Sequence, residues 1–178
     1  MPAMSVRFVS IAGPLPWKTI ALMRRAGAST DAYHLTAPLP TGEAAAAAIT
    51  VALADAGRDA TEIGYVNAHA SSTPLNEIAE ARALHLAIGP RVREVPVSGT
   101  KGLYGHALGA SGAIEAAITA LALRDGILPG TCNLAVLDPE IDLAVLTGPM
   151  ERRVDVALST SFGFGGLNAA LVLGAVRD

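Results

Sequence analysis

The sequence has 178 residues, of which 51% are hydrophobic and only 4% aromatic, and its formal net charge is −3 at pH 7. That charge gives no electrostatic basis for binding nucleic acid, and a single cysteine excludes an internal disulfide. No apolar run approaches the ~20 residues of a membrane-spanning helix, and the apolar patch within residues 1–16 is too short for a signal peptide. We therefore expect one soluble, cytoplasmic domain in which helices pack on a sheet.

The first residues are the hardest to assign to secondary structure. Ser5–Ala12 has the composition of a strand, and the glycine and prolines that follow separate it from a short helix predicted over Lys18–Ala26. Ala28–Pro40 is polar and interrupted by prolines, so we expect a loop there.

From residue 41 onward, helix and strand patterns alternate. Glu43–Ala56 is alanine-rich and ends at Gly57, a common helix C-terminus, and Thr73–Pro74 suits the start of a second helix. The expected helices cover 43–56, 74 to about 88 and 113 to about 125; the expected strands cover 63–68, 92–97, 154–159 and 169–176, with irregular chain over 127–142. This order predicts an α/β fold with a mixed, mostly parallel sheet and helices on both faces, the last two strands being joined by an antiparallel connection.

One glycine-rich segment, Ser98–Glu115, places Lys101, His106 and Glu115 within fifteen residues. The helix that follows is apolar on almost every side, so we expect it to be buried. A buried carboxylate without a partner is costly, and Lys101 is the nearest basic candidate to pair with Glu115. The glycines allow backbone to approach backbone or a ligand closely.

His69, at the end of a predicted strand, and His106 are candidates for a shared site. Ligands gather at the carboxyl ends of strands in α/β sheets, and two neutral imidazoles converging on one oxygen stabilise developing negative charge. The alternatives are two histidines that cap strands by bonding backbone carbonyls, and a weakly supported metal site that adds His34.

The sequence offers no convincing nucleophile to accompany these charge-stabilising groups. Cys132 has no histidine in register and no helix N-terminus to lower its pKa, so we interpret it as structural. Ser111 and Ser159 have no recognisable base.

Three segments resemble motifs of the β-ketoacyl-[acyl-carrier-protein] synthases, especially the type II elongating enzymes: Val66–Asn76, Ser98–Glu115 and Ser159–Asn168. The resemblance runs from about residue 28 to the end. It implies that 28–178 form the C-terminal half of a thiolase-like fold and leaves 1–27 as an atypical N-terminal segment. In these enzymes two similar halves make up the fold, and the nucleophilic cysteine belongs to the N-terminal half.

The resemblance implies a role for each matching polar residue. His69 and His106 correspond to the two histidines that bind the malonyl thioester carbonyl and stabilise the enolate formed on decarboxylation. Lys101 corresponds to the lysine that supports this site, and Glu115 to the buried acid of the same network. No metal and no separate cofactor are implied, because the substrates are carried on the phosphopantetheine arm of acyl carrier protein.

Four further residues correspond to substrate-binding positions. Ser71 and Thr73 match two hydroxyls that hydrogen-bond the phosphopantetheine arm. Phe164 matches the gating phenylalanine, whose backbone N–H contributes to the acyl oxyanion hole. Phe162 lies in the same segment and is assigned to the same substrate-binding set.

The implied reaction is decarboxylative Claisen condensation of an acyl thioester with malonyl-acyl carrier protein, in fatty acid or polyketide biosynthesis. We expect the chain alone to be inactive, to need a cysteine-containing N-terminal ketosynthase half, and to form homo- or hetero-oligomers. Two alternatives remain: a non-catalytic partner comparable to a chain-length factor, and an inactive remnant of a truncated gene. Two departures from the family pattern are Ala70 in place of the usual glycine and Gly102, which is expected to loosen the loop holding His106.

Overall fold

Six strands form one mixed sheet in the computed structural model, which describes residues 21–176. Their order across the sheet is β1-β8-β7-β2-β3-β5. The strands are β1 (Ala21–Thr30), β2 (Ile63–Asn67), β3 (Pro96–Ser98), β5 (Ala144–Val145), β7 (Val156–Gly163) and β8 (Leu167–Ala175); β4 (Ile127–Leu128) and β6 (Met150–Glu151) form a separate pair. β7, β2, β3 and β5 run parallel, whereas β8 is antiparallel to both β7 and β1.

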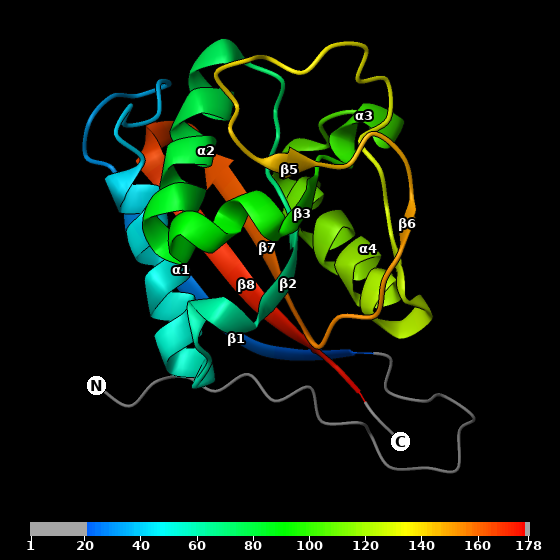
Figure 1. Ribbon diagram of the computed structural model, residues 1–178. Helices are drawn as coiled ribbons and strands as arrows, with labels where there is room; N and C mark the ends of the chain where they lie inside the picture. The colour runs from blue at the N-terminus through cyan, green and yellow to red at the C-terminus, as the bar shows by residue number, and fades with distance from the viewer. Residues whose placement is uncertain (1–20, 177–178) are drawn as a thin grey trace.

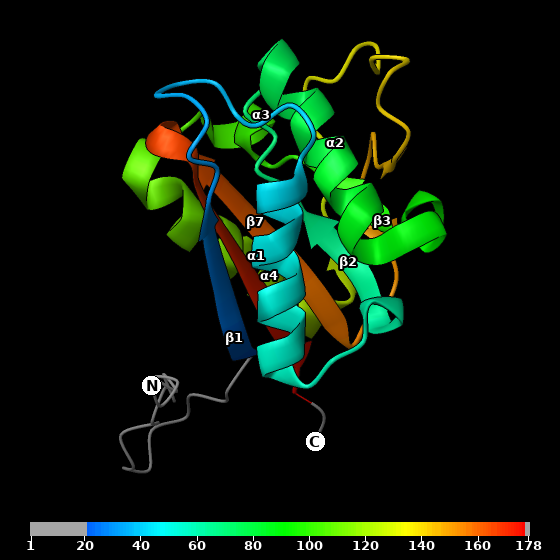
Figure 2. The ribbon, with the colours of Figure 1, turned by 90° about the vertical axis from the view of Figure 1, so that its left-hand side faces the viewer.

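Helices cover both faces of this sheet (Figure 1). α1 (Glu43–Ala56) and α2 (Pro74–Ile88) lie on one face, and α4 (Ser111–Asp125) packs on the other against β7 and β8 (Figure 2). α3 (Lys101–Tyr104) is a single turn between β3 and α4. The predicted α/β architecture with a mixed sheet and helices on both faces is therefore confirmed. Among residues 21–176, no helix is both long and apolar enough to cross a membrane.

The alanine-rich sequence of α1 allows it to pack unusually close to the sheet. A Cβ atom at Gly27 of β1 would lie only 2.0 Å from the carbonyl oxygen of Ala48, so this approach requires glycine. Ile49 and Leu53 of the same helix are buried against the strands. α1 and α2 have the predicted bounds, and Gly57 ends α1 in the left-handed conformation. Thr73 occupies the N-cap position of α2, but its side chain makes no capping hydrogen bond.

The first described segment differs from the prediction. Residues 21–26, predicted as part of a helix, belong to strand β1, which pairs antiparallel with β8. β1 extends to Thr30 and so crosses the predicted boundary between residues 27 and 28. The strand predicted over Ser5–Ala12 lies outside the described residues.

Helix α4 is not buried in the way its sequence suggests. The positions facing the sheet include the polar Ser111, Glu115 and Thr119. Ile114 and Ile118 are only half-buried and Leu121 is 40% exposed. The helix therefore places polar groups inward and leaves an apolar stripe on its outer side.

Two strand boundaries also differ from the sequence pattern. Val92 lies in a 3₁₀ segment, Gly89–Glu94, so β3 is reduced to three residues. β7 continues through the residues predicted as a connection, and a tight turn at Phe164–Gly166 leads into β8. The predicted antiparallel pairing of the last two strands is confirmed.

Candidate active site

The parallel arrangement of β2, β3 and β7 brings three chain segments to one edge of the sheet. Asn67, the last residue of β2, pairs with Ser98 on one side and Ser159 on the other. His69 follows β2, and Lys101 follows β3, so both leave the carboxyl ends of neighbouring strands. Polar side chains that are far apart in sequence therefore meet here, as expected for this class of sheet.

Lys101 and Glu115 form a buried ion pair, as the sequence predicts. The Lys101 ammonium donates to Glu115 Oε1 and to the backbone carbonyl of His69, and its Nζ lies 3.3 Å from His69 Nδ1. The two side chains are 5% and 0% exposed. Burial raises the pKa of Glu115, while the hydrogen bond and charge of Lys101 oppose that rise. One lysine therefore links the carboxylate on α4 to the loop after β2.

The His69 ring is held neutral. Burial lowers its pKa to about 3, and the charge of Lys101 acts in the same direction. Because an ammonium group only donates hydrogen bonds, Lys101 faces Nδ1 as an acceptor, which leaves the ring proton on Nε2. His69 therefore presents a neutral N–H donor on the side away from Lys101.

The His106 ring, like that of His69, has its Nδ1 held by a hydrogen-bond donor, but the neighbours are different. The backbone N–H of Leu108 donates to its Nδ1 at 3.1 Å, and the Ser111 hydroxyl lies 3.0 Å from the same atom. In the neutral ring the proton is consequently on Nε2. The centroids of the two imidazoles are 5.4 Å apart, and the ring planes meet at 79°.

These contacts correct three readings of the sequence. Within residues 21–176 neither imidazole bonds a backbone carbonyl, so the strand-capping alternative is wrong for this part of the chain. Ser111 does have a histidine neighbour, which the sequence did not reveal, and its place there is to orient that ring. His34 instead accepts hydrogen bonds from the backbone of Thr36 and Ala37, and residues 21–176 contain no trio of potential metal ligands.

Glu80, on α2, is a component of this site that sequence reasoning missed. Its carboxylate accepts the backbone N–H groups of His69 and Ala70, at 2.8 and 2.9 Å, and the hydroxyl of Thr160 at 2.7 Å. It thereby fixes the loop that carries His69. The only sequence signal is a glutamate on the helix that follows the His69 loop, at a position between small residues.

Substitution of Glu80 should make the stability of the chain less dependent on pH. Burial raises the pKa of Glu80 from 4.5 to about 7, so between these values the folded chain holds a proton that the unfolded chain has lost. Stability should fall as the pH rises through this window, by about 3 kcal/mol at most. In urea unfolding, the difference in free energy of unfolding between the wild type and Glu80→Gln should become smaller from pH 5 to pH 8. A difference that stays constant with pH would contradict the raised pKa of Glu80.

The loop after β2 also carries the two predicted hydroxyls. Ser71 Oγ and Thr73 Oγ1 are 3.0 Å apart, and Thr73 is exposed. Ala70 has a φ of 39°, in the left-handed region that favours glycine. Its Cβ is accommodated because residue 99 is glycine: a Cβ added there would lie 2.5 Å from that of Ala70.

The two phenylalanines lie at different depths. The Phe162 ring is half-buried and 5.7 Å from that of His69, whereas Phe164 is 77% exposed on the turn between β7 and β8. This turn is tied to the segment after β1, because Gly165 N donates to the carbonyl of Leu35 and Gly166 accepts from the N–H of Asp31. Phe162, but not Phe164, therefore contacts the histidine cluster within the described chain.

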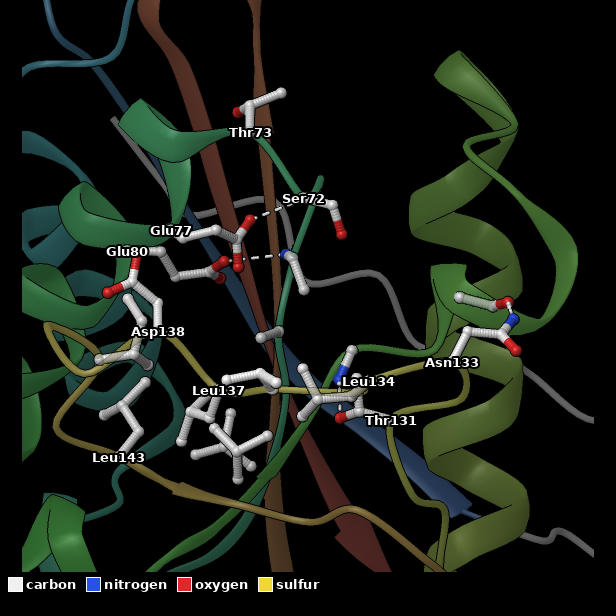
Figure 3. A pocket seen from close by; sticks show the side chains of 18 of the residues that line it. Ser72, Thr73, Glu77, Glu80, Thr131, Asn133, Leu134, Leu137, Asp138 and Leu143 are labelled. Carbon is white, nitrogen blue, oxygen red and sulfur yellow. Dashed lines mark hydrogen bonds between the residues drawn. The ribbon is translucent and has the colours of Figure 1, made fainter.

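A separate crevice of about 330 Å³ lies between the start of α2 and residues 131–145 (Figure 3). Its lining includes Glu80 and Gly102 but neither histidine, and the exposed Cys132 contributes to its wall. The carbonyl oxygen of Cys132 lies against Gly102, where an added Cβ would be 2.2 Å away. This glycine therefore permits a close backbone contact, and the expectation that Gly102 loosens its loop stays a prediction.

Comparisons with known proteins agree with these features. A family model described as "Beta-ketoacyl synthase, C-terminal domain" matches residues 20–135. The 3-oxoacyl-[acyl-carrier-protein] synthase 2 of Synechocystis sp. is 48% identical over 142 residues, covering 79% of this chain and 34% of that protein. Its namesake from Mycobacterium tuberculosis is 44% identical over 156 residues, covering 87% and 37%. The chain thus spans about a third of the length of these relatives.

Solved ketosynthases have the same fold. A type II PKS acyl-carrier protein in complex with its ketosynthase gives a TM-score of 0.86 at 32% identity, covering 88% of this chain and 39% of the other. A beta-ketoacyl synthase from Burkholderia phymatum gives 0.83 at 35% identity, with 89% and 38% covered. The ishigamide ketosynthase/chain length factor gives 0.83 at 33%, with the same coverage. The thiolase-like fold expected from the sequence is confirmed.

Proposed function

The chain belongs to the beta-ketoacyl synthase family, whose C-terminal domain it carries, and on this basis we propose that it supplies the malonyl-binding and decarboxylating part of a condensing site. The single observation that carries this proposal is the pair of adjacent imidazoles, His69 and His106, whose Nδ1 atoms are both occupied. Each ring has its Nδ1 engaged by a donor, so His69 and His106 both offer an Nε2–H. Two such donors suit an oxygen on which negative charge develops.

The proposed reaction follows from that arrangement. As malonyl thioester loses carbon dioxide, the electron pair of the broken carbon–carbon bond forms an enolate whose oxygen accepts from His69 and His106. The enolate carbon then attacks an acyl thioester, and the thiolate of its cysteine leaves. Because the pKa of His69 is about 3, this ring stays a neutral donor throughout the physiological pH range.

Lys101 and Glu115 act as positioning residues in this scheme. Lys101 anchors the His69 backbone and faces its Nδ1, while Glu115 balances the lysine charge in a buried setting. The hydroxyl pair of the half-buried Ser71 and the exposed Thr73 is suited to hydrogen-bond the phosphopantetheine arm of acyl carrier protein. No separate cofactor takes part.

We propose that the turn at Phe164–Gly166 contacts the acyl group. The Phe164 side chain is exposed at the tip of the turn between β7 and β8, so its ring is accessible to act as a gate. Its backbone N–H contributes to the acyl oxyanion hole, and Phe162 packs beside His69.

The nucleophile is assigned to a cysteine-containing half outside these 178 residues. Cys132 lines the separate crevice and not the histidine cluster. The outer stripe of α4 offers an apolar surface for that half, because Ala113, Ala117 and Leu121 are exposed and Ile114 is half-buried. We propose a homo- or hetero-oligomer in which this stripe is covered.

Reconstitution tests the proposal. Malonyl-acyl carrier protein decarboxylation is measured for the purified chain, alone and mixed with the separately expressed N-terminal half of the Synechocystis relative. Carbon dioxide release only in the mixture supports a split condensing enzyme. A folded chain that releases none in either case contradicts it and favours a non-catalytic, chain-length-factor-like partner or a remnant. Turnover by the chain alone would place the nucleophile within it.

A further inference from the structure

The segment after β4 contacts the backbone on both sides of Lys101. Thr131 Oγ1 accepts the N–H of Gly99 at 3.1 Å, and Asn133 Nδ2 donates to the carbonyl of Gly102 at 2.8 Å. The segment is itself anchored, because the N–H of Thr131 donates to the carbonyl of Leu146 at 2.8 Å. Figure 3 shows Thr131 and Asn133 on the side of the crevice opposite Glu77 and Glu80.

Helix α3 itself provides no N–H donor for the carbonyl of Gly102. In a continuing helix it would accept the N–H of His106, four residues later. Instead α3 ends at Gly105, whose φ of 81° and ψ of 176° are essentially restricted to glycine. His106 thereby leaves the helix and turns toward His69. The Asn133 amide supplies the donor that His106 no longer provides.

The backbone at both ends of this contact is adapted to it. Asn133 has a φ of 63°, a left-handed conformation that asparagine tolerates better than most residues. Gly102 lacks the Cβ that would meet the carbonyl oxygen of Cys132 at 2.2 Å. The contact therefore needs an amide donor on one side and a glycine on the other.

We propose that Asn133 is a positioning residue that holds His106 opposite His69 by capping the end of α3. It acts through the Gly102 carbonyl and touches neither substrate nor the reacting atoms. Its catalytic consequence rests on the proposed function, but its effect on the His106 ring does not.

Two substitutions distinguish the contribution of the Asn133 side-chain amide from that of the backbone conformation at this residue. Asn133→Gly keeps a residue that adopts positive φ freely and removes the donor; Asn133→Asp keeps the size and turns a carboxylate toward the carbonyl. Val136→Ala, at an 83% exposed position of the same segment, is the matched control. Nitrogen-15 spectra of the full chain report the ring tautomer of His106, and nuclear Overhauser effects report its proximity to His69.

Wild type and Val136→Ala should show the Nε2–H tautomer of His106 and a contact with the His69 ring. Both Asn133 variants should lose that contact and give averaged tautomers; in the reconstituted mixture kcat should fall about tenfold with KM unchanged. Variants that lower the melting temperature but keep the His106 spectrum would overturn the proposal, even if kcat falls. If the wild-type mixture has no turnover, the proposed function fails while the spectra still decide the role of Asn133.

Discussion

Replacement of Lys101 by methionine should lower the free energy of unfolding by about 3–5 kcal/mol at pH 7, because it leaves a buried carboxylate without its ion partner. Glu115 is fully buried, and methionine keeps most of the apolar stem while removing the charge. Lys101 also donates to the His69 carbonyl, so the loop after β2 loses an anchor at the same time. Guanidinium unfolding of the wild type and the variant measures the difference.

The pH dependence of this loss identifies its cause. Burial already raises the pKa of Glu115, and removal of Lys101 should raise it further, so the folded variant takes up a proton as the pH falls. The deficit should accordingly be smaller at pH 5 than at pH 8. Arg93→Met is the matched control, since Arg93 and Asp142 form an ion pair of 2.6 Å that is exposed, and no measurable change is expected. Equal losses in the two variants would contradict a special role for the buried pair.

His106→Ala should reduce malonyl decarboxylation by the reconstituted mixture about 10²–10³-fold, because one of two donors to the developing enolate oxygen is lost. His106 is exposed in the described chain, so the free energy of unfolding should stay within about 0.5 kcal/mol of the wild type. Initial rates of carbon dioxide release and a parallel unfolding curve measure the two quantities.

His85, which lies outside the site, is the control residue for the His106→Ala experiment. His85 lies on α2, where its Nε2 is 2.8 Å from the carbonyl of Asp142, away from the cluster. His85→Ala should retain the wild-type rate. A His106→Ala variant with more than half of the wild-type rate would rule out His106 as a donor to the enolate.

Local patterns in the sequence were sufficient for the helices and for the buried ion pair. α1 and α2 follow their apolar periodicity and glycine stops, and the costly carboxylate of Glu115 finds the nearest lysine. The acceptors that hold the His69 backbone N–H were not predictable in this way, because Glu80 and Thr160 are 80 residues apart and meet only in the folded protein. The same holds for Asn133, whose contact with Gly102 spans 31 residues.

Where the prediction failed, tertiary pairing overrode local preference. β1 contains leucine, methionine, arginine and alanine, which favour helices in isolation. It nevertheless forms a strand, because it pairs with β8 along its length. The orientation of α4 was also predicted wrongly. Its isoleucines suggested the side that packs on the sheet, but Glu115 and Thr119 are the residues that face the sheet.

The strand order also constrains how the chain acquires its fold during synthesis. Ala21 of β1 pairs with Ala175 of β8, and β8 and β7 together separate β1 from β2. In the described sheet β1 pairs with β8 alone, so it stays unpaired until β8 is present, whereas β2 can already pair with β3 before β7 arrives. The contact order is therefore high, which slows folding and leaves strand edges open to aggregation in the interval.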